Sequence, residues 1–373
     1  NMLKGKLLHS PEEMDGAMKT FETVLELIDS AKESIKIHMY VWRSDEIGNS
    51  IGKALFRAAE RGVEISITKD QSAMMYERIE MNRKSYLPCE PSKLKSLWWK
   101  IIAPTFPDTF VEDQFVNGAG KKLINHTNVR IDWIKGVHTH QKYYLIDNQH
   151  LITGSINIED RHRKYFDYMV HLEQDTLGEH FYKRESGQIA FDLNREIEFI
   201  FNQPMNGASR FEIKPLLIRL LKESKKEVYI EVAYIGDPDI EDALKEAATR
   251  GVQVNLLLSE KANIGNDNNY KHAEKIMKSG SARIFLTPKM IHSKMIAVDR
   301  KIIFSGSANL SIFSMCNSGE LNLIIKEPNL VKDFLRVADY RKSVSQEVKD
   351  PRILANYNRK VAFLQELHQK LKL

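Results

Sequence analysis

The chain contains one polar pattern twice, and the two copies have the same internal spacing. The copies consist of His140, Lys142, Asp147, Gly154, Ser155 and Asn157, and of His292, Lys294, Asp299, Gly306, Ser307 and Asn309. A single His-x-Lys match arises easily by chance in 373 residues, but two extended matches with equal spacing do not. The chain is therefore expected to fold as two similar halves that each carry the same polar set.

Each copy reads as a hairpin of two strands. Apolar residues 143–146 and 295–298 follow the two lysines, and Asp147-Asn148 and Asp299-Arg300 then provide turn residues before a second apolar run. Side chains two positions apart on a strand share a face. Each histidine is thus expected to point with its lysine, and each serine with its asparagine.

Two imidazoles, two ammonium groups and two carboxamides brought together suit a phosphodiester. One histidine would attack phosphorus, the other would protonate the leaving oxygen, and the remaining groups would stabilise charge on the non-bridging oxygens. The predicted catalytic residues are His140, Lys142, Asn157, His292, Lys294 and Asn309. This chemistry requires no metal and no cofactor, and none is predicted.

Carboxylates are expected to orient the two imidazoles, because a neutral imidazole needs a partner on its second nitrogen. Asp167 and Glu320 follow the two Gly-Ser elements at nearly equal distances and are the candidates. Asp147 and Asp299 are expected to stabilise the hairpin turns. Ser155 and Ser307 are assigned supporting roles, since neither lies in the Gly-x-Ser-x-Gly elbow of a serine nucleophile.

These residues resemble the phospholipase D superfamily, whose members duplicate the His-x-Lys-x4-Asp motif. The segments 154–160 and 306–311, followed by Asn317 and Glu320, are most similar to the cardiolipin synthase and bacterial phospholipase D branch. The resemblance implies a covalent phosphohistidine intermediate that water or an alcohol resolves. It also implies that His140 is the nucleophile and that His292 is the acid and then the base.

The duplication extends beyond the motifs. Residues 34–42 parallel 227–235, and residues 58–63 parallel 247–252. The alternation of elements predicts an α/β fold of two similar lobes, each a mixed β-sheet flanked by helices, with the active site at the pseudo-two-fold interface. The predicted lobes are 1–201 and 211–373, joined by a linker over 202–210. The predicted closing helices are 191–201 and 331–344.

The first half holds extra residues between the matched helix and the motif histidine. The two copies of the helix are about 189 residues apart in the sequence, whereas the two histidines are only about 152 residues apart. The roughly 37 extra residues fall mainly within 71–128. They include Trp98 and Trp99 among lysines and aliphatic residues. This pair suits contact with lipid headgroups, although a short helix packed on its own lobe is the simpler interpretation.

Composition limits the class of protein but does not select the substrate. The chain is 42% hydrophobic, its net charge is +5, and Cys89 and Cys316 are its two cysteines, which excludes a disulfide framework. No apolar run reaches the length of a membrane span, so the chain as given is expected to be soluble, and a cytoplasmic, peripherally membrane-associated location would fit. Residues 351–373 read as an amphipathic segment that is expected to pack on its lobe, with membrane docking as the alternative.

Two readings of the function differ in substrate. The first is a hydrolase or phosphatidyltransferase that acts on phospholipids at a membrane surface, and the second is a metal-independent nuclease of the same superfamily. The scattered lysines favour the first, since a nuclease should show a basic groove with aromatic platforms. A third reading, a non-enzymatic membrane scaffold with a degenerate site, would be expected to have a broken motif, whereas both motifs are intact. Both half-motifs in one chain favour a monomer.

Two further features are judged on position alone. His138 shares a face with His140 and is a candidate to line the pocket, although its counterpart in the second half is Met290. The basic run 161–164 is expected to be a solvated surface, with a clamp on an anionic headgroup as the alternative.

Overall fold

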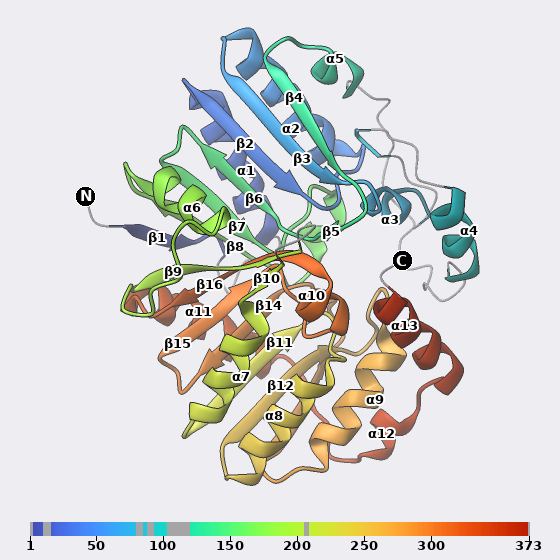
Figure 1. The fold of residues 1–373 in the computed structure, drawn as a ribbon. Helices are drawn as coiled ribbons and strands as arrows, with labels where there is room; N and C mark the ends of the chain where they lie inside the picture. The colour runs from blue at the N-terminus through green and yellow to red at the C-terminus, as the bar shows by residue number, and fades with distance from the viewer. Residues whose placement is uncertain are drawn as a thin grey trace. The chain divides into compact units, whose positions relative to one another are not determined.

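The structure is a computed structural model that describes residues 3–9, 16–79, 85–87, 93–102, 120–204 and 209–371. It consists of two α/β lobes, and the boundary between them falls after Ile189. Each lobe has a mixed sheet flanked by helices (Figure 1). The predicted fold class of two similar α/β lobes is confirmed.

The sheet of the first lobe has seven strands in the order β1-β8-β7-β6-β2-β3-β4. Their bounds are β1 Lys4–Leu7, β2 Ser34–Met39, β3 Glu64–Asp70, β4 Val129–Ile134, β6 Tyr143–Ile146, β7 His150–Gly154 and β8 Met169–Glu173, and the short β5 is His138–Thr139. Strands β2, β3 and β4 are parallel, whereas β6, β7 and β8 pair antiparallel. The helices are α1 Gly16–Ser30, α2 Glu46–Glu60, α3 Ala73–Ile79, α4 Lys93–Ile102, α5 Gly120–Ile124 and α6 Leu177–Glu185, with the 3-10 helix η3 Asp160–Lys164.

The sheet of the second lobe follows the order β10-β9-β16-β15-β14-β11-β12-β13-β17. Its strands are β9 Ile197–Gln203, β10 Arg210–Phe211, β11 Glu227–Val232, β12 Gln253–Ser259, β13 Ala282–Thr287, β14 Lys294–Val298, β15 Ile302–Gly306, β16 Ser318–Ile325 and β17 Gln346–Glu347. Its helices are α7 Ile213–Glu223, α8 Pro238–Thr249, α9 Asn266–Met277, α10 Ile312–Cys316, α11 Pro328–Ser343, α12 Arg352–Ala355 and α13 Arg359–Leu371.

The order of strands shows how far the duplication extends. The run β9-β16-β15-β14-β11-β12-β13 repeats the order of the first sheet strand for strand. In both lobes the hairpin that carries the second half of the motif lies next to the strand that opens the repeat, β2 or β11. The same sequence pattern is therefore held at the same place in two equivalent sheets.

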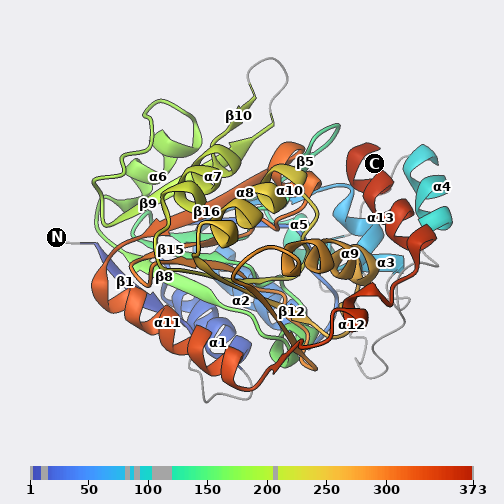
Figure 2. The same cartoon turned by 90° about the horizontal axis from the view of Figure 1, so that it is seen from below.

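Alternation along the strands decides which face each helix covers. In β11, Val228, Ile230 and Val232 join a core with α7, α8 and α9, whereas Tyr229 and Glu231 face α11. Figure 2 shows α7 and α8 on one side of the second-lobe strands and α11 on the other. The first lobe is built alike, since the matching residues of β2 join a core with α1 and α2. Successive side chains of β11 therefore alternate between an apolar core on one face and the buried cluster of Tyr229, Glu231 and Arg341 on the other.

One predicted closing helix is wrong. Residues 191–201 contain no helix and include most of strand β9, which pairs with β16 and is the first strand of the second lobe. The helix that closes the first lobe is α6. Part of the expected linker over 202–210 belongs to β9 and β10, and residues 205–208 lie outside the described residues. The second closing helix, expected at 331–344, is confirmed as α11.

The C-terminal segment packs on its own lobe, as its pattern predicts. Helix α13 lies against α9, where Lys271 Nζ is 2.6 Å from Glu366 Oε2 and Asn268 donates its backbone N–H to Gln365. Ala362 is buried, while Phe363 is exposed. The helix is therefore part of the second lobe, with Phe363 and Leu371 left outside the contact.

Candidate active site

His140 and Lys142 of the first lobe lie just before β6 and point to the same side of the chain. Both are buried and both contact Tyr40, which follows β2. The imidazole meets the Tyr40 ring edge to face at 4.7 Å, and the ammonium lies 5.5 Å from the ring centre. Lys142 Nζ also donates to the His140 carbonyl oxygen at 2.8 Å. The spacing of two residues thus gives the shared face that the sequence predicts.

His292 and Lys294 form the equivalent pair in the second lobe. Lys294 Nζ lies 3.3 Å and 3.4 Å from the two ring nitrogens of His292, and it donates to the His292 carbonyl oxygen. Both side chains are buried. The second pair thus repeats the first, with the lysine folded back onto its own histidine.

The two Gly-Ser elements are held by close backbone contacts. A Cβ on Gly154 would lie 2.6 Å from the Tyr168 carbonyl oxygen, and one on Gly306 would lie 2.2 Å from that of Leu321. Only glycine fits between the two strands at these points. The serines that follow are buried, so their hydroxyls point into the lobe.

The predicted carboxylates bind those serines. Ser155 Oγ donates to Asp167, and Ser307 Oγ donates to Glu320 at 2.5 Å. Both acids are buried. The structure therefore brings each supporting acid together with the serine of its own motif.

The two asparagines are buried beside these groups. Asn157 Oδ1 accepts the backbone N–H of Val41 at 3.2 Å, which leaves its amide N–H groups to face other partners. Asn309 Oδ1 is buried and has no hydrogen-bond partner in the part of the chain that the structure describes.

His162 belongs to the first half-site although its sequence context predicted a solvated surface. It is fully buried, with Nδ1 2.7 Å from Asp167 Oδ2 and Nε2 2.8 Å from Glu159 Oε1. Burial opposes its charge, but the hydrogen bonds to Asp167 and Glu159 outweigh burial and raise the pKa of His162 above its usual value. His162 thus shares Asp167 with Ser155.

The expected solvated run over 161–164 is therefore wrong for its first two residues. Arg161 is buried against Glu159 at 2.9 Å, and Arg43 reaches the same carboxylate at 2.5 Å. The signal available in the sequence was the Glu159-x-x-His162 spacing, because one turn of the 3-10 helix η3 places these side chains on the same side. Lys164 at the end of the run is exposed.

A second carboxylate lies next to the first motif. Asp70, at the end of β3, accepts the backbone N–H of Thr139 at 2.9 Å and the hydroxyl of Ser72. The candidate pocket residue His138 is buried, with Nδ1 2.9 Å from Ser72 Oγ and 3.5 Å from Asp70 Oδ2. Burial would raise the pKa of Asp70, but the bonds from His138, Ser72 and Thr139 hold it below its usual value.

In the second lobe a buried ion pair lies behind the motif. Ser293, between His292 and Lys294, points to the opposite face and donates to Glu231 at 2.5 Å. Arg341 of α11 binds the same carboxylate, and the Tyr229 hydroxyl donates to it at 2.8 Å. The strand that presents His292 and Lys294 on one face is thus anchored to a helix through its other face.

Asp147 and Asp299 lie at the far ends of the hairpins, away from the histidines. Each has a positive φ, of 49° and 51°, as the hairpin turn requires. Each carboxylate accepts three successive backbone N–H groups at the start of the neighbouring strand, from Lys32 to Ser34 and from Lys225 to Glu227. Burial would raise their pKa values, but these bonds outweigh it and lower both.

Part of the insertion in the first lobe is described. Helix α4 carries Trp98, which is partly buried, while the side chain of Trp99 lies outside the described residues.

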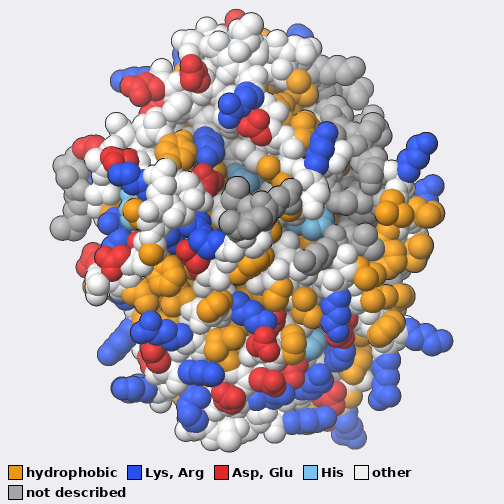
Figure 3. All heavy atoms as spheres, in the orientation of Figure 1, with side chains coloured by type: hydrophobic (Ala, Val, Ile, Leu, Met, Phe, Trp, Pro, Cys, Tyr) orange, Lys and Arg blue, Asp and Glu red, His pale blue; other side chains and the backbone are white. Residues whose placement is uncertain are grey.

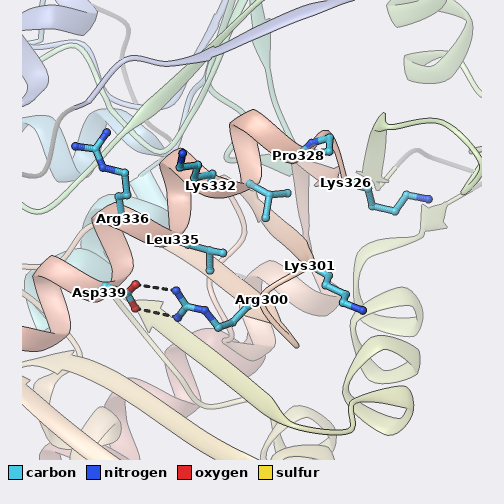
Figure 4. A pocket seen from close by; sticks show the side chains of 9 residues that line it. Arg300, Lys301, Lys326, Pro328, Lys332, Leu335, Arg336 and Asp339 are labelled. Atoms are coloured by element: carbon cyan, nitrogen blue, oxygen red, sulfur yellow. Dashed lines mark hydrogen bonds and ion pairs between the residues drawn. The ribbon is translucent and has the colours of Figure 1, made fainter.

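The second lobe also has a basic groove, drawn in Figure 4, whose lining includes none of the predicted catalytic residues. It surrounds Arg300, beyond the end of β14 opposite to Lys294.

The chain was compared with known proteins. A family model described as "Cardiolipin synthase, PLD-like domain" matches residues 24–184 and 217–341. A cardiolipin synthase of Clostridium perfringens (strain 13) is 25% identical over 352 residues, which cover 83% of this chain and 65% of that protein. Cardiolipin synthase 1 of Bacillus anthracis is 22% identical over 367 residues, which cover 89% and 66%.

Among solved structures, the phosphatidylserine synthase of Haemophilus influenzae Rd KW20 has the same fold, with a TM-score of 0.68 and 13% identity over 99% of this chain and 93% of that one. The chain spans slightly less than two thirds of the length of the two cardiolipin synthases. The family match nevertheless takes in both half-sites. The chain belongs to the phospholipase D-like family, in its cardiolipin synthase branch.

Proposed function

We propose that this protein is a phosphatidyltransferase that moves the phosphatidyl group of a phospholipid to an alcohol, and to water when no alcohol is present. The observation that carries the proposal is the presence of two buried half-sites of equal composition in one chain, each with a histidine, a lysine, a serine and an asparagine. A double displacement at phosphorus needs a nucleophile and a general acid, and two histidines can fill these two roles. Transfer also agrees with the names of the relatives in sequence, which are cardiolipin synthases.

In the first step, an imidazole nitrogen of His140 attacks phosphorus and the bond from phosphorus to the leaving alcohol oxygen breaks. His292 gives a proton to that oxygen, and a phosphohistidine remains. In the second step, His292 takes the proton of the incoming alcohol, whose oxygen attacks phosphorus while the bond to His140 breaks. The proposed mechanism requires both half-sites to act on the same phosphorus atom in both steps.

The reaction also requires groups that stabilise negative charge on the non-bridging oxygens of the phosphate. Lys142 and Lys294 each lie beside the histidine of their own motif, and Asn157 and Asn309 offer amide N–H groups. Buried ammonium and amide groups that are already oriented stabilise a pentacoordinate phosphorus more strongly than water does. Asp167 and Glu320 are assigned to support these groups through Ser155 and Ser307.

The proposed substrate implies a peripheral encounter with a membrane. In the described segments, no helix combines the length and apolar character that crossing a bilayer requires. The proposal treats the protein as a single chain that completes its own site and meets phospholipid at the bilayer surface.

The experiment is an assay of the purified chain with vesicles of several phospholipids, with and without glycerol, beside plasmid and single-stranded DNA, with products read by mass spectrometry. New phosphatidyl alcohols in the presence of glycerol would support transfer. Cleavage of DNA without lipid turnover would replace the proposal by a nuclease.

A trapping experiment tests the roles of the histidines. Rapid acid quenching during turnover should give a phosphorylated peptide that contains His140, and His140→Asn should remove it. His292→Asn should slow both formation and breakdown of the intermediate, because one imidazole serves as acid and base. Phosphate found on the peptide of His292 would reverse the two roles.

A further inference from the structure

Helix α4 carries an apolar stripe that faces away from its lobe. Leu94, Leu97 and Ile101 are 70%, 60% and 56% exposed. Their spacing of three and four residues places them on one side of the helix. Trp98, one turn after Leu94, lies at the edge of this stripe and is partly buried. A surface helix normally turns its apolar side to the core, so an outward stripe indicates a surface that another apolar phase covers.

The charges of α4 indicate which phase that is. The helix contains Lys93, Lys95 and Lys100 and no acidic residue, and Lys93 and Lys100 are exposed beside the stripe. Lysine ammonium groups next to exposed leucine and isoleucine match the surface of a bilayer with anionic headgroups, where the stems lie along the apolar layer and the charges reach the phosphates. A second copy of the same surface would place lysines against lysines. Charge complementarity therefore favours lipid.

The position of α4 in the chain connects this surface to the half-site. Strand β3 ends at Asp70, whose carboxylate binds the backbone N–H of Thr139, the residue before His140. The insertion that carries α3 and α4 begins directly after Asp70, so it leaves the lobe at the end of the sheet where His140 lies. Figures 1 and 2 both show α4 at the outer edge of its lobe, and Figure 3 shows apolar side chains with lysines beside them there.

We infer that the stripe of Leu94, Leu97 and Ile101 inserts into the surface of an anionic phospholipid bilayer, with Lys93 and Lys100 on the headgroups. The inference rests on the proposed function, because it states how that site meets its substrate. It adds three neighbouring residues of the same helix to the expected contact at Trp98 and Trp99, which stays a prediction because the side chain of Trp99 lies outside the described residues.

Two other surfaces provide matched comparisons. Phe363 of α13 is 62% exposed, but Glu366 lies one turn further along that helix. The basic groove in Figure 4 is lined by Lys332 and Arg336, among others. It lies near the C-terminal end of β14, whereas Lys294 is at the N-terminal end of that strand. Phe363 shares an exposed apolar side chain with α4, and the groove shares its positive charge. The two surfaces therefore separate the effect of apolar exposure from that of charge.

The experiment is flotation of the full chain with vesicles of phosphatidylglycerol and phosphatidylcholine, and with phosphatidylcholine alone. The triple variant Leu94→Ser, Leu97→Ser and Ile101→Ser should lose at least about tenfold in binding to the anionic vesicles. The pair Lys93→Ala with Lys100→Ala should weaken binding and reduce its dependence on salt. Phe363→Ser and the pair Lys332→Ala with Arg336→Ala should bind as the unaltered protein does.

A second measurement protects against loss of folding in the triple variant. Leu97→Trp adds an indole at the centre of the stripe, and its fluorescence should be quenched by brominated lipids in anionic vesicles. The triple variant should also keep its turnover of a short, soluble phosphodiester.

Several results would overturn the inference. Flotation would contradict it if the triple variant binds vesicles as before, if Phe363→Ser loses as much binding, or if only the groove variants lose binding. Absence of fluorescence quenching at position 97 would also contradict it. A change of oligomeric state in the triple variant would make a second copy of the chain the occupant of the stripe. Binding is measured without turnover. If the triple variant loses flotation but the unaltered protein does not turn over lipid, the inference stands and the proposed function is refuted. If the triple variant floats normally and the unaltered protein turns over lipid, the proposed function stands and the inference is refuted.

Discussion

Gly306 shows how little room the motif leaves at the scale of one residue. The close approach of the Leu321 carbonyl oxygen explains why glycine precedes the serine, and Ser307 then binds Glu320. The serine could be assigned a supporting role from sequence, but its partner could be named only as a candidate. Nothing in the local sequence determines which distant acid a buried hydroxyl will reach.

Gly306→Ala should destabilise the second lobe by about 1–3 kcal/mol, because the new methyl group would overlap a backbone oxygen that cannot move without breaking strand pairing. The control is Gly62→Ala, where φ is +90° and no atom lies within 4 Å of the added Cβ. Its cost should be limited to backbone strain, about 1–2 kcal/mol. Urea unfolding of both variants measures the difference. Equal costs would show that the overlap at Gly306 is relieved by relaxation.

His162 makes the stability of the first lobe depend on pH. Because its folded pKa is raised above 6.5, the charged form contributes stability that is fully present below pH 6.5 and is lost as the pH rises through the folded pKa. His162→Gln should therefore cost more stability at pH 6 than at pH 9. Denaturant unfolding of both proteins at the two pH values measures this. A constant difference would mean that His162 stays neutral between Asp167 and Glu159.

At the scale of elements, the hairpins could be predicted because their turn chemistry is local. Asp147 and Asp299 occupy turns with positive φ and bind the start of the neighbouring strand, which accounts for the acid in each motif. The closing helix expected at 191–201 was wrong because strand β9 is buried on both faces. A short, nearly continuous apolar segment reads alike as a buried helix or a buried strand, and only its pairing with β16 decides.

The ion pair of Arg341 and Glu231 joins α11 to the centre of the second sheet. Arg341→Met should cost about 3–5 kcal/mol, because it leaves the Glu231 carboxylate buried without its partner. Arg341→Met combined with Glu231→Gln should recover part of that loss, since no buried charge remains. Arg336→Met, on the exposed side of the same helix, should change stability by less than about 0.5 kcal/mol. A double variant no more stable than Arg341→Met alone would contradict this account.

At the scale of the whole molecule, the two half-sites carry all the groups that the proposed reaction uses. Lys142, Lys294, Asn157 and Asn309 supply the cationic and donor groups that a metal ion would otherwise provide. Activity on vesicles should therefore survive an excess of EDTA. Complete loss that a divalent ion restores would refute the mechanism. A soluble phosphodiester assayed in parallel distinguishes this from an effect of the ion on vesicle charge.

The sequence by itself determined the two-lobe α/β fold, the family and the identity of both His-x-Lys pairs, because a spacing of two on a strand and a turn after it are local properties that recur in each copy. Only the tertiary structure decided which acids meet which serines, that His162 and Arg161 are buried, that β9 is a strand, and that α4 turns Leu94, Leu97 and Ile101 outward. These depend on which surfaces distant segments bury against one another. Burial is a property of the folded chain as a whole, and a local pattern of residue types does not specify it.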